Sequence, residues 1–512
     1  MKGNARTVGE QRRKEKDNVF GVGSRAPVAI VILIKNPEHK GECKIHFAAV
    51  GDYLTREEKL KQTADAKGIY GLKFEDIVPD SHGDWMNQRE DSFRTFMRMD
   101  GKKTNEVAMF KNFSLGVCTN RDVWAVNSSK QKLSHNMKKT INFYNQEVRR
   151  SLNNAQFEID ADMTSISWIH PQRVGISKGI VSEAFSEQFM FNESYRPFFK
   201  QSLYFDKFWV NRVYQMPQLY PTNTTRNLAI CVNQSSNGSG QIALMSNCIA
   251  DLHFNGDSQC FPRYVFEKTA AKATENASLF EDPSTENEVA GYERKDAITS
   301  EALKHFQDAY PSEDITTDAI FYYIYGILHS EEYRTRYANN LMKELPRIPR
   351  VATYEAFKKF EEAGRKLADL HVNFEQVEEY KTVKVNIDKR EGWSYYVSQM
   401  KYGKIPGKTG NAAKDKTKLV YNDFITVEGI PLEAQEYVVN KRSALDWIVE
   451  RACVKVDKDS GIVNDFNDFA AEKGDPRYPL SLFLKVLTVS LETMKIVKGL
   501  PRLDIHQLDK QP

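Results

Sequence analysis

Two short segments of the chain carry residue types that can hold a metal ion or a phosphate group. The first contains Cys248, Asp251, His253 and Cys260, without the close CxxC or HxxxH pair that zinc sites use. The second runs from residue 403 to residue 409 and has three residues between its glycines, where a phosphate-binding loop needs four. We therefore predict core or strand roles for the first segment and a mobile basic loop for the second.

The sequence also lacks the motifs of several enzyme classes. Neither Gly-x-Ser-x-Gly nor HExxH occurs. Adenine methylation needs a glycine-rich turn for S-adenosylmethionine and an (Asn/Asp)-Pro-Pro-(Tyr/Phe) turn that holds a flipped base. The glycines at 21 and 23 are out of register for the first turn, and no Pro-Pro dipeptide exists. We therefore predict no catalytic, cofactor-binding or metal-binding residue in this chain.

Length and composition indicate a globular protein of two to four domains. The chain has 512 residues, 41% of them hydrophobic, and no run of 18 apolar residues that could span a membrane. Six scattered cysteines fit reduced thiols in a cytoplasm better than a disulfide framework. Because the net charge is only +3, a nucleic-acid binder of this composition must gather its cations on one surface.

Residues 321–350 predict a pair of amphipathic helices. The first helix has its N-cap at Thr316 or Thr317 and ends at Ser330, which can cap the second. Its apolar face repeats at helical spacing, on Phe321, Ile324, Tyr325 and Leu328. The second helix repeats every four residues, on Tyr333, Tyr337, Leu341 and Leu345. Pro346 then ends the helix, because proline cannot donate the next hydrogen bond.

Other elements follow from hydrophobic periodicity and turn residues. Near the N-terminus we predict a hairpin of strands 27–34 and 44–50, then a helix capped by Thr55 in a capping box with Glu58. A second hairpin is predicted over 109–127, with its turn at 119–122. Helices are predicted at 130–154, 299–372, 431–450 and 479–498, and a β-rich, aromatic module at 165–270.

Several long segments together resemble the C-terminal half of the single-chain type ISP restriction-modification enzymes. They are GNARTVGEQRRKE from residue 3, FGVGSRAPVAIVILIKNP from 20, PDSHGDWMNQREDSF from 79, SYRPFFKQSLYFD from 194, QCFPRY from 259, the helix pair 321–350 and KRSALDWIVERACVKVDKDSGIVND from 441. The resemblance covers nearly the whole chain. It implies the end of an adenine-N6 DNA methyltransferase domain followed by a C-terminal specificity, or target recognition, domain.

The resemblance implies a domain order. Residues 1–130 correspond to the C-terminal remnant of the methyltransferase domain, 131–160 to a connecting helix and 161–500 to the specificity domain. The last divides into a β-rich part (161–270), a linker (271–298), a helical part (299–375) and a mixed part (376–500). The family's cofactor glycines and Pro-Pro turn would lie upstream of Met1, so we expect a fragment. S-adenosylmethionine, ATP and magnesium are expected only for the complete family enzyme.

Target recognition requires cations for phosphates and Arg, Asn or Gln for base edges. The candidates lie among aromatics in the β-rich module and on the outer face of the helix pair: Gln172, Arg173, Arg196, Lys200, Arg212, Arg226, Arg263, Arg336, Lys343 and Arg347. The basic loop at 403–418 is a further place for contact with a DNA backbone. Phe20 falls near the position where such methyltransferases put an aromatic against a flipped adenine; the competing role is a hairpin core residue.

The predicted fold class is mixed α+β: the truncated C-terminal edge of an α/β methyltransferase sheet, followed by a mixed β-rich and helical target recognition domain. The predicted function is the sequence-specific DNA recognition portion of a type ISP enzyme, a helicase-associated system of bacterial defence. Double-stranded DNA is the predicted partner, with an upstream methyltransferase, helicase and nuclease polypeptide. Two alternatives remain: a methyltransferase or restriction subunit active only when an upstream chain completes it, and a non-catalytic interaction module or decayed remnant.

Overall fold

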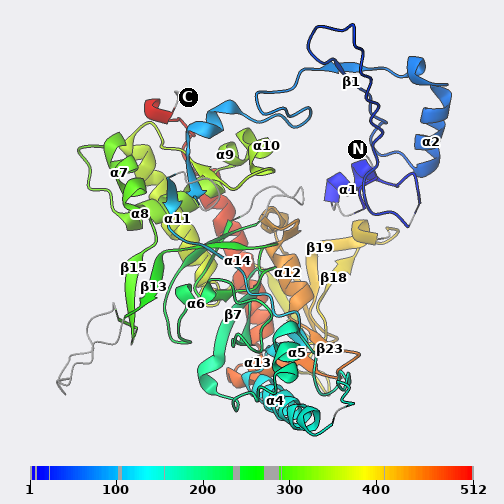
Figure 1. Cartoon of the computed structure of the whole chain (residues 1–512). Helices are drawn as coiled ribbons and strands as arrows, with labels where there is room; N and C mark the ends of the chain where they lie inside the picture. The colour runs from blue at the N-terminus through cyan, green and yellow to red at the C-terminus, as the bar shows by residue number, and fades with distance from the viewer. Residues whose placement is uncertain are drawn as a thin grey trace.

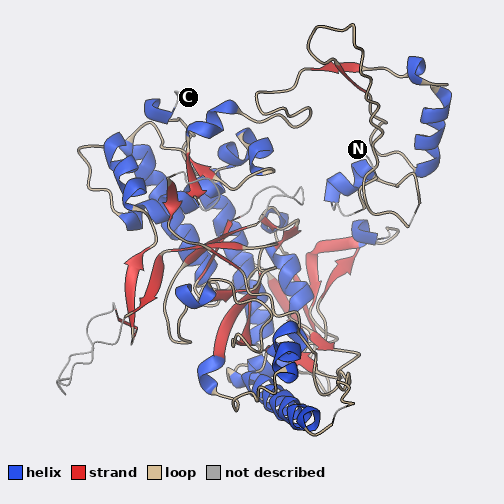
Figure 2. Ribbon diagram, viewed as in Figure 1, coloured by secondary structure: helices blue, strands red, loops and turns tan. Residues whose placement is uncertain are grey.

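The computed structural model describes residues 3–5, 9–21, 23–101, 107–154, 156–233, 243–269, 288–289, 291–408 and 410–509. Fourteen α-helices and several sheets of two to four strands make up this described part, which is a mixed α+β arrangement. Figure 1 shows a body that contains most of the elements and a lobe near the N-terminus at its upper right. Figure 2 shows the strands as separate small sheets with helices between and around them.

The lobe near the N-terminus has few regular elements. They are α1 (Gly9–Glu15), β1 (Ile45–Phe47), α2 (Arg56–Asp65) and β2 (Glu75–Ile77). The predicted helix after Thr55 is confirmed, with both hydrogen bonds of the capping box to Glu58. A 3-10 turn (Ile69–Gly71) follows it.

The predicted hairpin of strands 27–34 and 44–50 is wrong. β1 pairs antiparallel with β2 instead, and residues 29–34 form neither helix nor strand. Ile30 and Ile34 are 84% and 83% exposed. A β-branched run of this kind suits a strand covered on both faces. The lobe offers no such cover, because the hydrophobic clusters of the described chain begin only at Phe93.

Two four-stranded sheets form the β-rich part of the body. One has the order β10 (Ala243–Ser246), β9 (Ala229–Val232), β12 (Gln259–Pro262) and β5 (Ser114–Leu115). The other has the order β11 (Ile249–Ala250), β7 (Met190–Arg196), β8 (Phe199–Tyr204) and β6 (Val126–Asn127). The predicted hairpin over 109–127 is therefore wrong, since β5 and β6 pair with strands far away in the sequence. The short helix α3 (Asp122–Ala125) lies between them.

Helices flank these sheets, and further short strands pair across the chain. The helices are α4 (Lys130–Leu152), which confirms the prediction over 130–154, α5 (His170–Ser177) and α6 (Met216–Leu219). β3 (Met97–Asp100) pairs with β4 (Ala108–Phe110) and β16 (Arg347–Ile348). β13 (Tyr264–Lys268) pairs with β15 (Tyr292–Asp296), and β14 (Glu288–Val289) pairs with β15 as well. The predicted linker 271–298 thus ends in strands; residues 270–287 and 290 lie outside the described residues.

The helical part contains α7 (Ser300–Ala309), α8 (Thr317–His329), α9 (Glu331–Arg336), α10 (Ala338–Leu341) and α11 (Tyr354–Val372). The predicted helix boundary at Ser330 is confirmed, since its hydroxyl accepts the N–H of Tyr333. The second predicted helix is interrupted at Tyr337, whose φ of −102° and ψ of 20° leave the helical region, and it ends at Leu341 before Pro346. The predicted apolar face holds, because Tyr333, Tyr337 and Leu341 are all buried.

The C-terminal part combines a four-stranded sheet with helices. The sheet has the order β17 (Lys384–Ile387), β20 (Ile425–Glu428), β19 (Lys414–Val420) and β18 (Lys401–Lys404). The helices are α12 (Ala444–Arg451), α13 (Phe466–Glu472) and α14 (Tyr478–Lys498), and two short hairpins pair β21 (Val438–Val439) with β22 (Arg442–Ser443) and β23 (Val454–Val456) with β24 (Val463–Asp465). One continuous helix over 431–450 is wrong, because Asn440 and Lys441 adopt positive φ in the β21–β22 turn.

Three hydrophobic clusters hold the body together. One joins the β-rich part to the C-terminal sheet and α14, with the rings of Phe199 and Phe466 only 4.7 Å apart. A second surrounds α8 and α11, and a third lies under α4. α14, predicted over 479–498, contributes to the first two clusters and runs through the middle of the body in Figure 1. Among the described helices none is long and apolar enough to cross a membrane.

Candidate nucleic-acid interface

Six of the ten predicted DNA-contacting side chains are engaged inside the protein. Gln172 on α5 is completely buried. Its Oε1 accepts the N–H of Ile169 at 3.1 Å and its Nε2 donates to the carbonyl of Phe208 at 2.7 Å. Both polar ends of the amide therefore serve the start of α5 and its connection to the 206–209 turn.

Arg196 and Lys200 belong to the β7–β8 hairpin and point into the body. Arg196 is 9% exposed, forms an ion pair of 2.6 Å with Asp251 and lies 3.9 Å from the ring centre of Tyr195. Burial raises the pKa of Asp251 to about 6, against the opposite pull of Arg196. The Nζ of Lys200 donates to the carbonyl of Val372 at 3.3 Å. These cations join neighbouring segments of the fold.

Three further candidates tie the helical part to other segments. Arg263 forms an ion pair with Asp318. Lys343 lies 2.7 Å from Asp84 and donates to the carbonyl of Asn87. The guanidinium of Arg347 lies 3.3 Å from Glu344 and donates to the carbonyls of Arg94 and Phe96. The outer face of the helix pair thus serves as an attachment for the 84–96 segment.

The other four candidates are exposed arginines. They are Arg173 on α5, Arg212, Arg226 and Arg336 on α9. None of the four forms a side-chain hydrogen bond or ion pair with a described residue, and Arg336 only covers the ring of its neighbour Tyr337, at 5.3 Å. Arg212 is fixed through its backbone, which exchanges two hydrogen bonds with Cys118. These guanidinium groups are available to an anionic partner.

A group of lysines on the β18–β19 hairpin is similarly available. Its exposed members are Lys401, Lys404, Lys408 and Lys414. The Lys/Gly composition at 403–418 indicated a basic loop, but the strand pairing went unrecognised because the segment has almost no apolar alternation. Hairpin formation holds the four ammonium groups on one projecting element, which points toward the N-terminal lobe in Figure 1.

Phe20 stands at the tip of a braced turn. Its ring is 72% exposed, so it is not a hairpin core residue. The backbone N–H of Phe20 donates to Oδ1 of Asn18, and the amide of Asn18 donates to the carbonyls of Gly3 and Ala26. The buried ammonium of Lys59 donates to the carbonyls of Glu15 and Asp17, at 2.6 and 2.5 Å. The fold therefore holds the turn and leaves the ring free.

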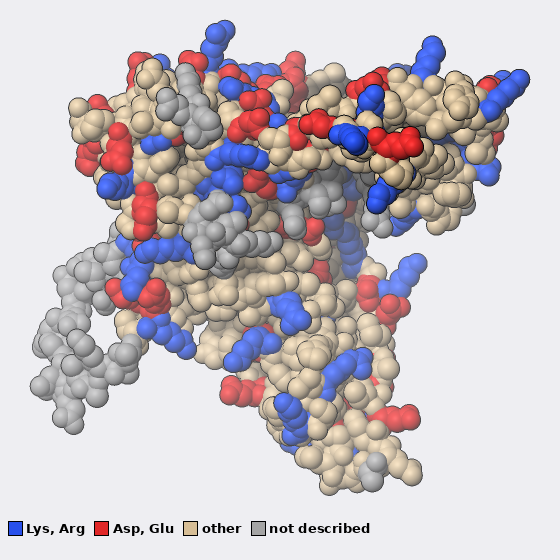
Figure 3. Space-filling model, turned by 45° about the horizontal axis from the view of Figure 1, so that its top comes forward, with Lys and Arg blue, Asp and Glu red and all other residues tan. Residues whose placement is uncertain are grey.

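Charge is not segregated on the face of the molecule that Figure 3 shows. In Figure 3 basic and acidic side chains are interspersed on the upper part of the visible face, and this face is hollowed beneath that upper part. Phosphate contact would therefore use local groups of cations, since the net charge of +3 gives no general attraction.

The chain was compared with known families, curated proteins and solved structures. The family model described as the type ISP C-terminal specificity domain matches residues 108–482. No curated protein matches the chain.

Three solved structures are similar over 99% of this chain. A nuclease-deletion mutant of the type ISP restriction-modification enzyme LlaGI, in complex with a DNA substrate mimic, is 32% identical with a TM-score of 0.80, and 43% of it is covered. The ATP-dependent type ISP enzyme LlaBIII, bound to DNA, is 30% identical with a TM-score of 0.82, and 30% of it is covered. A DrdV–DNA complex is 27% identical with a TM-score of 0.76, and 47% of it is covered. The chain thus spans less than half the length of each relative.

Proposed function

Because the chain belongs to the type ISP C-terminal specificity domain family, we propose that it recognises double-stranded DNA for a type ISP restriction-modification enzyme. The observation that carries this proposal is the similarity over 99% of the chain to type ISP enzymes that were solved with DNA or a DNA mimic. The TM-scores of 0.80 and 0.82 support this proposal, since they show that the fold is shared with those enzymes. A cytoplasmic location accords with this role.

The proposed phosphate contacts are exposed cations that the fold leaves unpaired. They are Arg173, Arg212, Arg226 and Arg336, together with Lys401, Lys404, Lys408 and Lys414 of the β18–β19 hairpin. Arginine and lysine on phosphates set the register of a protein on the duplex, and arginine can also read guanine edges. Gln172, Arg196, Lys200, Arg263, Lys343 and Arg347 are left out, since their polar groups already have protein partners.

A second proposal concerns the lobe near the N-terminus, which we infer docks on the methyltransferase part of a type ISP enzyme. Its exposed apolar run, Ile30, Val31, Ile32, Leu33 and Ile34, lies 65–85% open to solvent. A strand of this composition gains stability only when a sheet pairs with it and covers it. In such an assembly Phe20 would face the flipped base, and S-adenosylmethionine, ATP and magnesium would belong to the complete enzyme.

The DNA proposal is tested by duplex binding over a range of salt concentrations. Fluorescence anisotropy with mixed-sequence duplexes should show that the logarithm of the binding constant falls linearly with the logarithm of the salt concentration. This is expected because phosphate contacts release counterions. Absence of binding at the lowest salt would contradict the proposal and favour a non-catalytic interaction module.

The docking proposal has a separate test. A type ISP methyltransferase segment, produced as its own polypeptide, should co-purify with the wild-type chain and not with the Ile32→Lys variant. The matched control is Lys35→Glu, which changes charge beside the apolar run without changing the run. Equal recovery with the wild-type chain and Ile32→Lys would contradict docking through these residues.

A further inference from the structure

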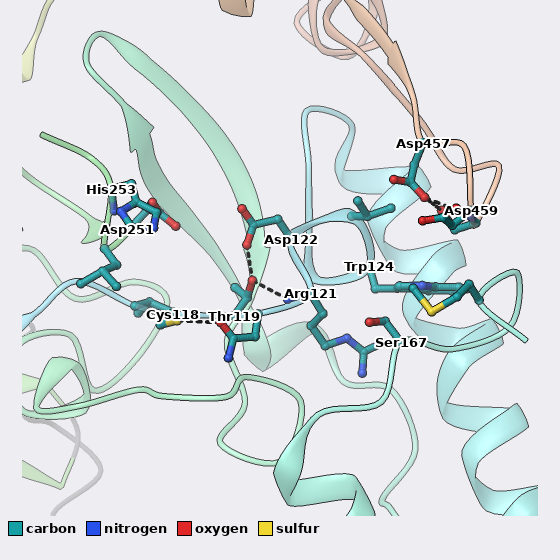
Figure 4. Close-up of a pocket in the computed structure, with 16 residues that line it drawn as sticks. Cys118, Thr119, Arg121, Asp122, Trp124, Ser167, Asp251, His253, Asp457 and Asp459 are labelled. Carbon is teal, nitrogen blue, oxygen red and sulfur yellow. Dashed lines mark hydrogen bonds between the residues drawn. The ribbon is translucent and has the colours of Figure 1, made fainter. Parts of the chain in front are cut away.

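A cavity of about 410 Å³ opens among segments that are distant in the sequence. Figure 4 shows its wall: residues 117–124, the 251–253 turn and the 457–460 turn between β23 and β24, with Ser167 on one side. Trp124 and Met163 give it an apolar surface, and Arg121 contributes the cation. The cavity therefore combines an indole ring and one guanidinium with four carboxylates and several polar groups.

Arg121 is a buried cation without a counter-charge. It is 4% exposed, and no described carboxylate forms an ion pair with it. Its Nη2 donates to the hydroxyl of Thr140 at 3.3 Å, whereas Nε and Nη1 have no hydrogen-bond partner in the described chain. The ring of Trp209 covers the guanidinium at 5.1 Å. A buried charge is costly unless it is paired, so an anion from outside would satisfy this group.

Three of the four carboxylates around the cavity, those of Asp122, Asp251 and Asp457, are engaged by neighbouring side chains, and the fourth belongs to Asp459. Asp122 accepts hydrogen bonds from Thr119 and from the hydroxyl of Tyr195, at 3.1 Å for the latter. Asp251 pairs with Arg196. Asp457 accepts the N–H and the hydroxyl of Ser460, at 2.8 and 2.7 Å. These acids on the rim leave room for one small anion at Arg121 and oppose an extended run of negative charge.

Two more groups favour an oxyanion. The indole N–H of Trp124 is buried and has no acceptor among the described residues. The guanidinium of Arg121 extends toward Ser167, whose hydroxyl can donate as well (Figure 4). Just outside, the exposed Arg212 is fastened by its backbone to Cys118 at the cavity wall. Arg121, Trp124 and Ser167 thus supply donors at the cavity, and the backbone of Arg212 lies beside its wall.

We propose that this cavity binds a single phosphate-type oxyanion, paired with Arg121 and hydrogen-bonded by Trp124 and Ser167. The phosphate comes either from the DNA backbone or from a free nucleotide or inorganic phosphate. Only the first source rests on the proposed function. Charge-assisted hydrogen bonds between a guanidinium and a phosphate are about twice as strong as hydrogen bonds between neutral groups.

The test is thermal unfolding of the full chain in rising inorganic phosphate, compared with chloride at equal ionic strength. The wild-type midpoint should rise saturably. Arg121→Met keeps the side-chain volume and removes a buried unpaired charge, so it should fold at least as well as wild type. The phosphate concentration that half-saturates this variant should be about tenfold higher than for wild type, or higher still, because a hydrogen-bonded charge is lost. Trp124→Phe, which keeps an aromatic ring and removes the indole N–H, should also weaken the response, and Arg149→Met, at an exposed arginine of α4, should not.

The outcomes separate the site from the DNA proposal. An identical phosphate response in wild type, Arg121→Met and Trp124→Phe would overturn the site, because a general salting effect acts on all three alike. The affinity for duplex DNA can be plotted against salt concentration with both on logarithmic scales. If Arg121→Met also lowers the slope of this plot by about one, the phosphate is a DNA phosphate. If only the phosphate response changes, the source is a free phosphate. If the chain binds phosphate through Arg121 but binds no duplex, the phosphate site is supported and the proposed DNA recognition is contradicted.

Discussion

Arg196 and Asp251 form an ion pair of 2.6 Å between β7 and the turn after β11, and both side chains are almost fully buried. The pair joins the two strands that run parallel in this sheet. A cation that looks suited to a DNA phosphate in the sequence is thus a structural group in the fold. Its loss should affect stability before it affects binding.

We predict that Arg196→Met destabilises the chain by about 3 kcal/mol, because it leaves Asp251 buried without its partner. Urea unfolding followed by tryptophan fluorescence measures this change. The control Arg226→Met removes an exposed arginine and should stay within about 0.5 kcal/mol of wild type. A value for Arg196→Met as small as that of the control would show that the pair is not structural.

Glu193 on β7 should be protonated in the folded protein. It is completely buried and neither carboxylate oxygen has a partner in the described chain, and burial raises its pKa well above the ordinary value. The folded state then binds more protons than the unfolded state once pH exceeds 4.5. Stability must therefore fall as pH rises from there, by about 1.4 kcal/mol for each pH unit up to the folded pKa.

Glu193→Gln removes this titration, so it should raise the unfolding midpoint at pH 7 and flatten the pH dependence above 4.5. Thermal unfolding from pH 5 to pH 8 measures both effects. Glu391→Gln changes an exposed carboxylate and serves as the control. A Glu193→Gln variant that is less stable than wild type at pH 7 would mean that the carboxylate is charged and satisfied.

His329 at the end of α8 should make the folded protein less stable as the pH falls, which is the opposite of the effect of Glu193. Burial lowers its pKa to about 4 from the ordinary 6.5, although the carbonyl of Tyr325 accepts its ring N–H. The unfolded state then binds more protons between these values, so stability should fall as pH drops from 6.5 toward 4. His329→Asn keeps a donor for the carbonyl and cannot titrate, so its midpoint should fall less over this range. An unchanged acid dependence would exclude His329 as a source.

Gly364 on α11 sits against α8 with no space for a side chain. A Cβ at this position would overlap the carbonyl oxygen of Tyr322, and one at Gly326 would overlap the carbonyl of Phe360. Gly364→Ala should therefore separate the two helices and destabilise the chain by about 2 kcal/mol or more, despite the better helix propensity of alanine. Lys366→Ala, on the exposed side of α11, should change the unfolding midpoint little. Equal effects of the two substitutions would contradict the close packing of α8 and α11.

Local signals in the sequence predicted the elements that local chemistry decides. The capping box at Thr55 and Glu58, the boundary at Ser330 and the stripe of α14 depend on residues within one or two turns. The predicted hairpin over 109–127 was wrong because β5 pairs with β12 and β6 pairs with β8, both far along the chain. Such pairing depends on the tertiary fold, which hydrophobic alternation does not encode.

The candidate DNA-contacting residues were also predicted only in part from the sequence. Residue type identified the cations, but the partner of each cation is set by packing. Arg263 meets Asp318 and Lys343 meets Asp84 only because helices bring them together. Arg121 gave no signal at all, since its unpaired guanidinium becomes apparent only when the cavity around it is seen.

The central claim is that cations left unpaired by the fold bind DNA, and the salt dependence of duplex affinity tests it most directly. We consider a variant with four substitutions, Arg173→Gln, Arg212→Gln, Arg226→Gln and Arg336→Gln. It should bind duplex DNA more weakly at low salt. The slope of the logarithm of its binding constant against the logarithm of salt concentration should become shallower by up to about 0.9 for each phosphate contact removed. A control that neutralises four lysines with acidic partners, Lys359, Lys381, Lys495 and Lys498, should keep the wild-type slope. A wild-type chain without duplex affinity, or a four-arginine variant with the wild-type slope and affinity, would contradict the account.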